Sequence, residues 1–102
     1  MEESYYIGSD LKFALSITVQ GGGFDQATSN YDIDIYCGSK KLHYTQEDIY
    51  ADGGEYYLMV PTSELRPGTM KMVVTAYVED DAFESGYRRE VDVRNIATIK
   101  NI

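Results

Sequence analysis

The sequence predicts an all-β protein, folded as an antiparallel β-sandwich of about seven strands with Greek-key connections. Apolar and polar residues alternate with a period of two in several separate stretches, as in strands with one buried face. Turn-forming residues separate these stretches, and none of them shows the period of an amphipathic helix. At 102 residues the chain has room for one domain, which we expect to span residues 1–102.

The first half of the chain contains three expected strands. Every second side chain is apolar over 11–20, so we expect a strand there, which the glycines at 21–23 end. Apolar residues alternate again over 31–37, and a tight turn at 38–40 leads into 41–45. The last two stretches are therefore expected to form a hairpin.

The middle of the chain combines a connection, a strand and a short helical turn. Residues 46–52 show no sustained alternation and are expected to connect two strands. Residues 55–60 predict a strand, which ends where a proline removes a ladder donor. We expect one helical turn over 62–65, with Thr62 or Ser63 as its N-terminal cap.

The longest expected strand lies in the last third of the chain. Residues 69–79 alternate, and the phase of Met70, Val74 and Val78 is expected to face the core. An acidic loop follows at 79–86, and residues 87–93 and 96–102 predict two final extended segments. The turns between these stretches favour a sandwich over a parallel βαβ fold.

The charge of the chain excludes some partners. The formal net charge is −8 and the sequence pI is about 4.4. Binding to a phosphate backbone depends on neutralising several phosphates with lysine and arginine. We therefore expect neither nucleic acid nor an anionic membrane surface as a partner.

The residues that nucleophilic catalysis needs are scarce in this sequence. Cys37 is the single cysteine and falls in an apolar strand phase, which predicts a buried structural thiol and no disulfide. His43, the single histidine, falls in a polar phase and is expected at the surface. Because no nucleophile and base are expected to meet, we predict that the protein is not an enzyme and carries no cofactor.

Carboxylates are plentiful, and two groups of them bear on function. Asp32 and Asp34 share a strand face that is expected to be solvated, where a catalytic pKa is not raised. A cluster in the acidic loop offers hard oxygen ligands for Ca²⁺ but lacks EF-hand spacing. We therefore expect no resident metal and keep as candidate ligands Glu79, Asp80, Asp81 and Glu84.

Ten tyrosines and no tryptophan distinguish the composition. Tyrosine offers a large, stiff contact area with a polar tip, which suits both protein interfaces and stacking against sugar rings. Tyrosines are also common in strands without any binding role. The candidate interaction surface comprises Tyr36, Tyr57 and Tyr77.

Several segments resemble known proteins. The corner LRPGTM at 65–70 resembles one that precedes a central strand in many bacterial and phage immunoglobulin-like sandwiches. Together with the segments at 6–13, 52–60 and 76–91, it is similar to small proteins encoded in prophage regions of gut bacteria, beside tail, baseplate and fibre genes. The resemblance implies an immunoglobulin-like fold and a structural role in the virion, and it assigns no role to individual residues.

We therefore expect a non-enzymatic structural or protein-interaction module, a component of a phage virion, with a carbohydrate-binding module as the alternative. The expected partners are other protein subunits, including copies of the same chain, and a glycan under the alternative. The end segments at 4–8 and 96–102 are expected to pair with a neighbouring chain's open edge. The acidic start has no apolar segment after it, so we expect synthesis in the cytoplasm without a signal peptide and incorporation into a virion.

Overall fold

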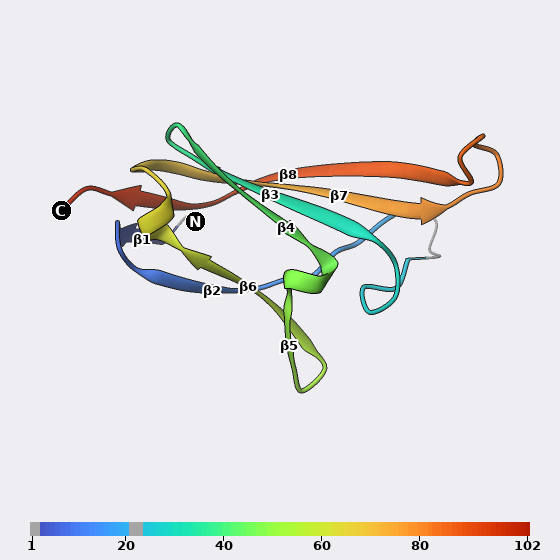
Figure 1. Cartoon of the computed structure of the whole chain (residues 1–102), viewed down its shortest axis with the longest axis horizontal. Helices are drawn as coiled ribbons and strands as arrows, with labels where there is room; N and C mark the ends of the chain where they lie inside the picture. The colour runs from blue at the N-terminus through green and yellow to red at the C-terminus, as the bar shows by residue number, and fades with distance from the viewer. Residues whose placement is uncertain (1–2, 21–23) are drawn as a thin grey trace.

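The computed structural model describes residues 3–20 and 24–102, and it consists mainly of strands (Figure 1). Within these residues eight strands form two sheets, so the expected all-β class is confirmed. The turn expected at 21–23 lies outside the described residues. The strands are β1 (Glu3–Tyr6), β2 (Asp10–Ala14), β3 (Tyr31–Cys37), β4 (Lys40–Thr45), β5 (Tyr50–Asp52), β6 (Glu55–Pro61), β7 (Gly68–Glu79) and β8 (Tyr87–Lys100).

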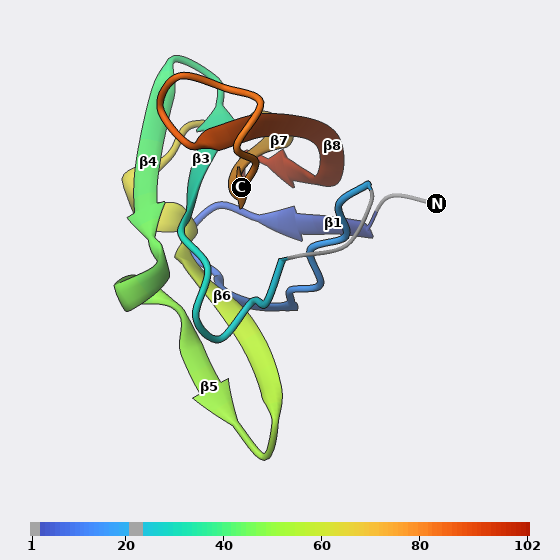
Figure 2. The ribbon, with the colours of Figure 1, turned by 90° about the vertical axis from the view of Figure 1, so that its right-hand side faces the viewer.

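The larger sheet has the strand order β1-β8-β7-β3-β4, and the smaller sheet has the order β2-β6-β5. In Figure 2, β4 lies at the left of the larger sheet and β8 at its right. The described pairings are antiparallel except for that of β1 with β8, which is parallel. The expectation of a purely antiparallel sandwich is therefore wrong at this edge. The N-terminal strand β1 lies beside β8, and just after β1 the Ile7 N–H donates to the Lys100 carbonyl at 2.8 Å. The chain then crosses to the smaller sheet and forms β2.

The core lies between the two sheets and matches the expected strand phases. The even-numbered residues of β7 from Met70 to Val78 are all buried, and Val74 is among them. On β3 the odd-numbered residues are buried, with Ile33 and Ile35 fully so. Leu58 and Val60 of β6 face them from the smaller sheet. Apolar burial of this kind is the main term that stabilises such a fold.

The strand expected over 11–20 is shorter than its pattern. Burial alternates as far as Gln20, but β2 ends at Ala14. The side chain of Gln26 accounts for the early end, because its Nε2 donates to the Leu15 carbonyl at 3.0 Å and its Oε1 accepts from the Ile17 N–H at 3.2 Å. A side-chain amide thus takes the place of a neighbouring strand.

The connection expected at 46–52 contains two short elements. A 3₁₀ turn, η1, spans Gln46–Asp48, and the Asp48 carboxylate accepts the Thr45 N–H at 2.8 Å. The chain then forms β5, which pairs with β6 and adds an edge to the smaller sheet. Because β5 is only three residues long, its sequence carries no alternation from which it could be predicted.

A second 3₁₀ turn, η2 (Thr62–Glu64), confirms the expected helical turn. The expectation that Thr62 or Ser63 caps it is wrong, because Pro61 occupies the cap position. The buried Thr62 hydroxyl instead donates to the Ser9 carbonyl at 2.6 Å and accepts from the Gly8 N–H at 2.9 Å. It therefore fastens the crossing between β1 and β2 to the end of β6.

Replacing Thr62 by valine is expected to lower the free energy of unfolding by about 1–3 kcal/mol, because the Gly8 N–H loses its partner. Thr62→Ser keeps the hydroxyl and should retain most of the stability. Denaturant unfolding of both variants measures the effect. Equal stability of the valine and serine variants would show that the hydroxyl does not fasten the crossing.

Candidate interaction surface

The hairpin of β7 and β8 is the largest single feature of the fold. These two strands have 12 and 14 residues and extend beyond the ends of β2 and β6 (Figure 1). The loop between them is closed by hydrogen bonds from the Asp80 N–H to the Gly86 carbonyl and from the Gly86 N–H to the Phe83 carbonyl, both at 2.9 Å. The two extended segments expected at 87–93 and 96–102 are one continuous strand.

A β-bulge in β8 changes which side chains face the core. Met70 is opposite Ala97, whereas the next residue of β7 is opposite Asn95, so Ile96 is the extra residue of the bulge. A shift of one residue turns every following side chain to the other face of a strand. Odd-numbered residues are therefore buried after the bulge, as Ala97 is, and face outward before it.

This change of phase exposes two valines on the outer face of the larger sheet. Val91 is 62% exposed and Val93 is 55% exposed. Without the bulge both would share a face with the buried Ala97. On β7 they lie opposite the half-buried Thr75 and Val73, respectively. The four side chains form an apolar strip at one side of the sheet, which we call the valine strip.

The valine strip borders an unpaired strand edge. β1 pairs only with the Ala97–Lys100 part of β8. The Tyr87–Asn95 part pairs with β7 on one side, and no strand of the described residues pairs with its other side. Proteins block such edges with lysine, proline or charged side chains; this stretch contains no lysine or proline, but five of its nine side chains are charged. We call it the open edge of β8.

The hydrogen bonds at the hairpin loop show which backbone groups face the open edge. The Asp80 N–H donates to the Gly86 carbonyl, and the one-to-one register continues without interruption to the bulge. Bonded and non-bonded positions alternate along an antiparallel ladder, so the even-numbered residues of β8 bond to β7. The N–H and C=O groups of Arg89, Val91 and Val93 therefore point away from β7, toward the open edge.

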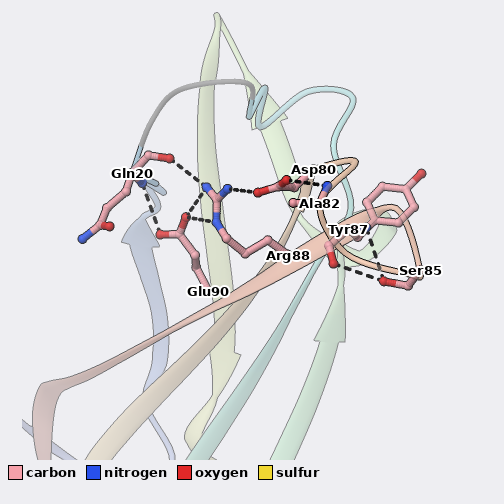
Figure 3. A network of polar contacts seen from close by, with 7 residues as sticks. All are labelled: Gln20, Asp80, Ala82, Ser85, Tyr87, Arg88 and Glu90. Atoms are coloured by element: carbon pink, nitrogen blue, oxygen red, sulfur yellow. Dashed lines mark hydrogen bonds and ion pairs between the residues drawn. The ribbon is translucent and has the colours of Figure 1, made fainter.

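The inner face of the same stretch is charged and holds the segment that follows β2 (Figure 3). Arg88 donates to Asp80 and Glu90, each at 2.8 Å, and to the Gln20 carbonyl at 2.9 Å. The Glu90 carboxylate also accepts the Gln20 N–H at 3.2 Å. Side chains of β8 thus bind this segment from the inner face, and the described backbone of residues 15–20 does not add to the ladder of β7 and β8.

The network around Arg88 lowers two carboxyl pKa values. The Ala82 N–H and the Arg88 guanidinium hold the pKa of Asp80 below its ordinary value of 3.8. The same guanidinium and the Gln20 N–H hold the pKa of Glu90 below its ordinary value of 4.5. A carboxyl whose pKa is lowered by folding stabilises the fold above its ordinary pKa and loses that effect as the pH falls through the lowered value.

Arg88→Gln is therefore expected to destabilise the protein most near neutral pH. The difference in stability from wild type should shrink as the pH falls below about 4, where both carboxylates become protonated. Arg89→Gln is the control, because it removes the same charge from the outer face, where Arg89 makes no ion pair with a described residue. Carboxyl groups titrate over a range from roughly pH 2.5 to about pH 6. A difference in stability between wild type and Arg88→Gln that stays constant over this range would contradict this role of Arg88.

The three tyrosines of the expected interaction surface do not lie together. Tyr36 is 40% exposed on the outer face of the larger sheet, where Lys41 Nζ lies 5.7 Å from its ring centroid. Tyr77 lies on the same face toward the hairpin loop, and its hydroxyl donates to Asp32 at 3.1 Å. Tyr57 lies on the other sheet. The expectation that they form one surface is therefore wrong, because their strands place them at separate points.

A different pair of tyrosines does share a site. Tyr77 and Tyr87 line an open cleft of about 310 Å³ together with Asn30 and Asp32. Burial and the hydrogen bond to Asp32 raise the pKa of Tyr77 above its ordinary value of 10.0, so its hydroxyl stays protonated as a donor. The sequence did not single out Tyr87, because its position beside Tyr77 depends on the pairing of β7 with β8.

Tyr57 belongs to a separate cluster on the outer face of the smaller sheet. Its ring centroid lies 6.3 Å from that of Tyr50 on β5. Lys12 of β2 places its ammonium 4.3 Å from the Tyr57 centroid and 5.3 Å from that of Tyr50. These contacts are cation–π interactions, which hold both rings in place on the sheet.

The structure does not gather the candidate metal ligands Glu79, Asp80, Asp81 and Glu84 into a site. Within residues 3–20 and 24–102 no three histidine, cysteine, aspartate or glutamate side chains are placed to hold an ion. Asp80 is bound instead by Arg88 at 2.8 Å.

Cys37 and His43 lie where the sequence predicts. Cys37 is buried, and burial raises the pKa of its thiol. A raised pKa disfavours the thiolate, which is the reactive form of cysteine. His43 is exposed on β4, and its Nδ1 lies 2.7 Å from a carboxylate oxygen of Asp34 on β3. The two residues are therefore a core thiol and a surface side chain.

Comparisons with protein-family models, with curated proteins and with solved structures find no match. No helix in the described part of the chain is long and apolar enough to cross a membrane. The chain is therefore defined by its architecture, as an all-β protein of two packed sheets. Its distinguishing feature is a long hairpin with an open, partly apolar edge.

Proposed function

We propose that the protein is a non-enzymatic structural module that binds another protein subunit through the open edge of β8 and the valine strip. The carrying observation is the exposure of Val91 and Val93 beside backbone groups that no described strand pairs with. Addition of a strand to such an edge is a general mode of protein recognition, in which backbone hydrogen bonds provide affinity and alternate side chains provide specificity.

We further propose that the protein itself is a component of a phage virion, associated with the tail, baseplate or fibre. We also propose that its fold is immunoglobulin-like with Greek-key connections. The resemblance of the corner at 65–70 and of the segments around it supports this proposal. The acidic chain, with a net charge of −8, favours a protein partner over nucleic acid.

Phage particles purified from the strain that carries the gene test the virion role. We expect the chain to remain with the particles in a density gradient, and its absence from them would overturn the virion role. A Val91→Lys, Val93→Lys variant tests the surface, because two added charges oppose strand addition without entering the core. The variant should lose association with the particles and unfold at the wild-type temperature. Undiminished association would overturn the role of the edge.

The cleft of Tyr77 and Tyr87 supports a second candidate function, a carbohydrate-binding module. Two aromatic rings with an amide and a carboxylate beside them offer stacking surface and hydrogen-bond partners, which is the chemistry that sugar rings need. On a glycan array, Tyr87→Ala should abolish any signal, whereas Tyr36→Ala, at a distant point of the same face, should keep it. An array without signal from the wild-type protein would remove this candidate.

A further inference from the structure

We infer that the occupant of the open edge of β8 is a second copy of this chain, paired with it antiparallel about a twofold axis at Asp92. The inference rests on the proposed function, since it identifies the partner of the same surface. Each copy would extend the other's larger sheet, and the two sheets would become one. The backbone, the charges and the space beside β1 support this pairing separately.

The backbone of the open edge permits only some registers. The free N–H and C=O groups belong to odd-numbered residues, so an odd-numbered residue of one copy must lie opposite an odd-numbered residue of the other. A twofold axis at Asp92 satisfies this rule, because it places Val91 opposite Val93 of the second copy. Axes at Glu90, Val91 and Val93 also satisfy the rule.

The charges favour the axis at Asp92 over the axis at Val91. With this axis, Glu90 of each copy faces Arg94 of the other copy. Pairs of unlike charge across two strands are stabilising. An axis at Val91 would instead place Glu90 opposite Asp92 and Arg88 opposite Arg94, which are like charges. With the axis at Asp92 the two Asp92 carboxylates face each other, but each is already bound by Arg94 Nε of its own strand at 2.6 Å.

The valine strip distinguishes the axis at Asp92 from the axis at Glu90. An axis at Glu90 would place Arg89 opposite Val91 of the second copy and the two Glu90 side chains opposite each other. With the axis at Asp92 each Val91 meets a Val93, and Val73 and Thr75 lie beside them in both copies. The two valine strips then become continuous across the interface, which removes part of the exposed surface of both valines from water.

The space beside β1 limits the register. With the axis at Asp92, paired residues run from Arg89 to Asn95 in each copy, and the first residue of β8 in the second copy, Tyr87, comes opposite Ala97, which pairs with β1. An axis at Val93 would instead place Arg89 of the second copy opposite Ala97 and bring a longer part of that strand onto β1.

The net charge of the edge also fits a second copy. The stretch from Tyr87 to Asn95 has three arginines and two acidic residues, a net charge of +1, whereas the whole chain carries −8. Two such chains repel each other over most of their surfaces. They can approach with the least repulsion where the local charge is smallest and mixed in sign.

Cysteine cross-linking of the full-length chain under mild oxidation tests the register. Two residues facing each other at a non-hydrogen-bonded position have Cα atoms about 4.5 Å apart, within the range of a disulfide. We expect Asp92→Cys to give about tenfold more disulfide-linked dimer than Glu90→Cys or Val91→Cys, because copies of those residues lie too far apart in this register. The wild-type chain, whose only cysteine is buried, provides the background.

Light scattering over a range of concentrations gives the second readout. The wild-type protein should rise toward twice the monomer mass, and the Val91→Lys, Val93→Lys variant should stay monomeric. Strongest cross-linking at Glu90→Cys or Val91→Cys would overturn the register. A monomer at all concentrations without cross-linking would overturn self-pairing. If the protein stays monomeric but the lysine variant loses its association with the particles, the proposed function stands with a different partner. If the lysine variant keeps that association, both self-pairing and the proposed function are overturned.

Discussion

Val74→Asp is expected to prevent stable folding. Val74 is 3% exposed on the inner face of β7, opposite Ile33 on β3 and Asp92 on β8. An aspartate there would bury a carboxylate across from a second one, Asp92, which already binds the nearby Arg94 at 2.6 Å. The loss of about 4 kcal/mol or more is comparable to the whole stability of a small domain.

Val74→Ala separates the charge from the loss of volume. Removal of two buried methyl groups should lower the free energy of unfolding by about 2 kcal/mol, so this variant should still fold. Circular dichroism and denaturant unfolding measure both variants. Cooperative unfolding of Val74→Asp at the wild-type temperature would contradict the inward position of Val74 and with it the strand phase of β7.

Gly38→Ala is expected to have the second largest effect. Gly38 lies in the turn between β3 and β4 with a φ of +64°, a conformation that side chains rarely adopt. A Cβ at this position would lie 2.5 Å from the Cβ of Arg66, closer than carbon atoms can approach. Backbone strain and overpacking together should lower the free energy of unfolding by about 3–4 kcal/mol.

Gly53→Ala is the matched control for this prediction. Its φ of +59° is almost the same, but nothing lies within 4 Å of the added Cβ. The control should therefore lose only the strain of about 1–2 kcal/mol. Equal losses in the two alanine variants, measured by denaturant unfolding, would show that the turn does not pack against the corner at Arg66.

Much of the fold could be predicted from the sequence, because a strand with one buried face repeats its apolar residues every second position. This pattern located β3, β4, β6 and β7 and placed Val74 in the core. Gly38 and Arg66 also belong to segments that the sequence identified, the hairpin turn and the corner. Their close contact was not predictable, because it depends on how separate turns meet in space.

The phase of β8 could not be predicted from the sequence alone. Val91, Val93, Ala97 and Ile99 are all odd-numbered apolar residues and suggest one common face. The bulge at Ile96 divides them, so that the last two are buried and the first two are exposed. Because the bulge depends on the register with β7, no local feature of the sequence predicts it.

The candidate site was predictable only in part for the same reason. Tyrosine content pointed to a contact surface, but Tyr36, Tyr57 and Tyr77 lie on strands whose positions are set by long-range pairing. The end segments expected to meet a neighbouring chain pair with each other instead. Residues 4–6 of the first segment belong to the outer strand β1, while most of the second segment lies inside the sheet as the end of β8.

Amide hydrogen exchange, resolved by residue at low and high protein concentration, tests most directly whether the open edge of β8 binds a partner strand. In dilute solution the amides of Glu90 and Asp92 should be protected, because they bond to β7, and those of Arg89, Val91 and Val93 should exchange fast. At high concentration the odd-numbered amides should become protected as well. Protection of Val91 and Val93 already in dilute monomer, or fast exchange at every concentration, would contradict the pairing of two copies through this edge.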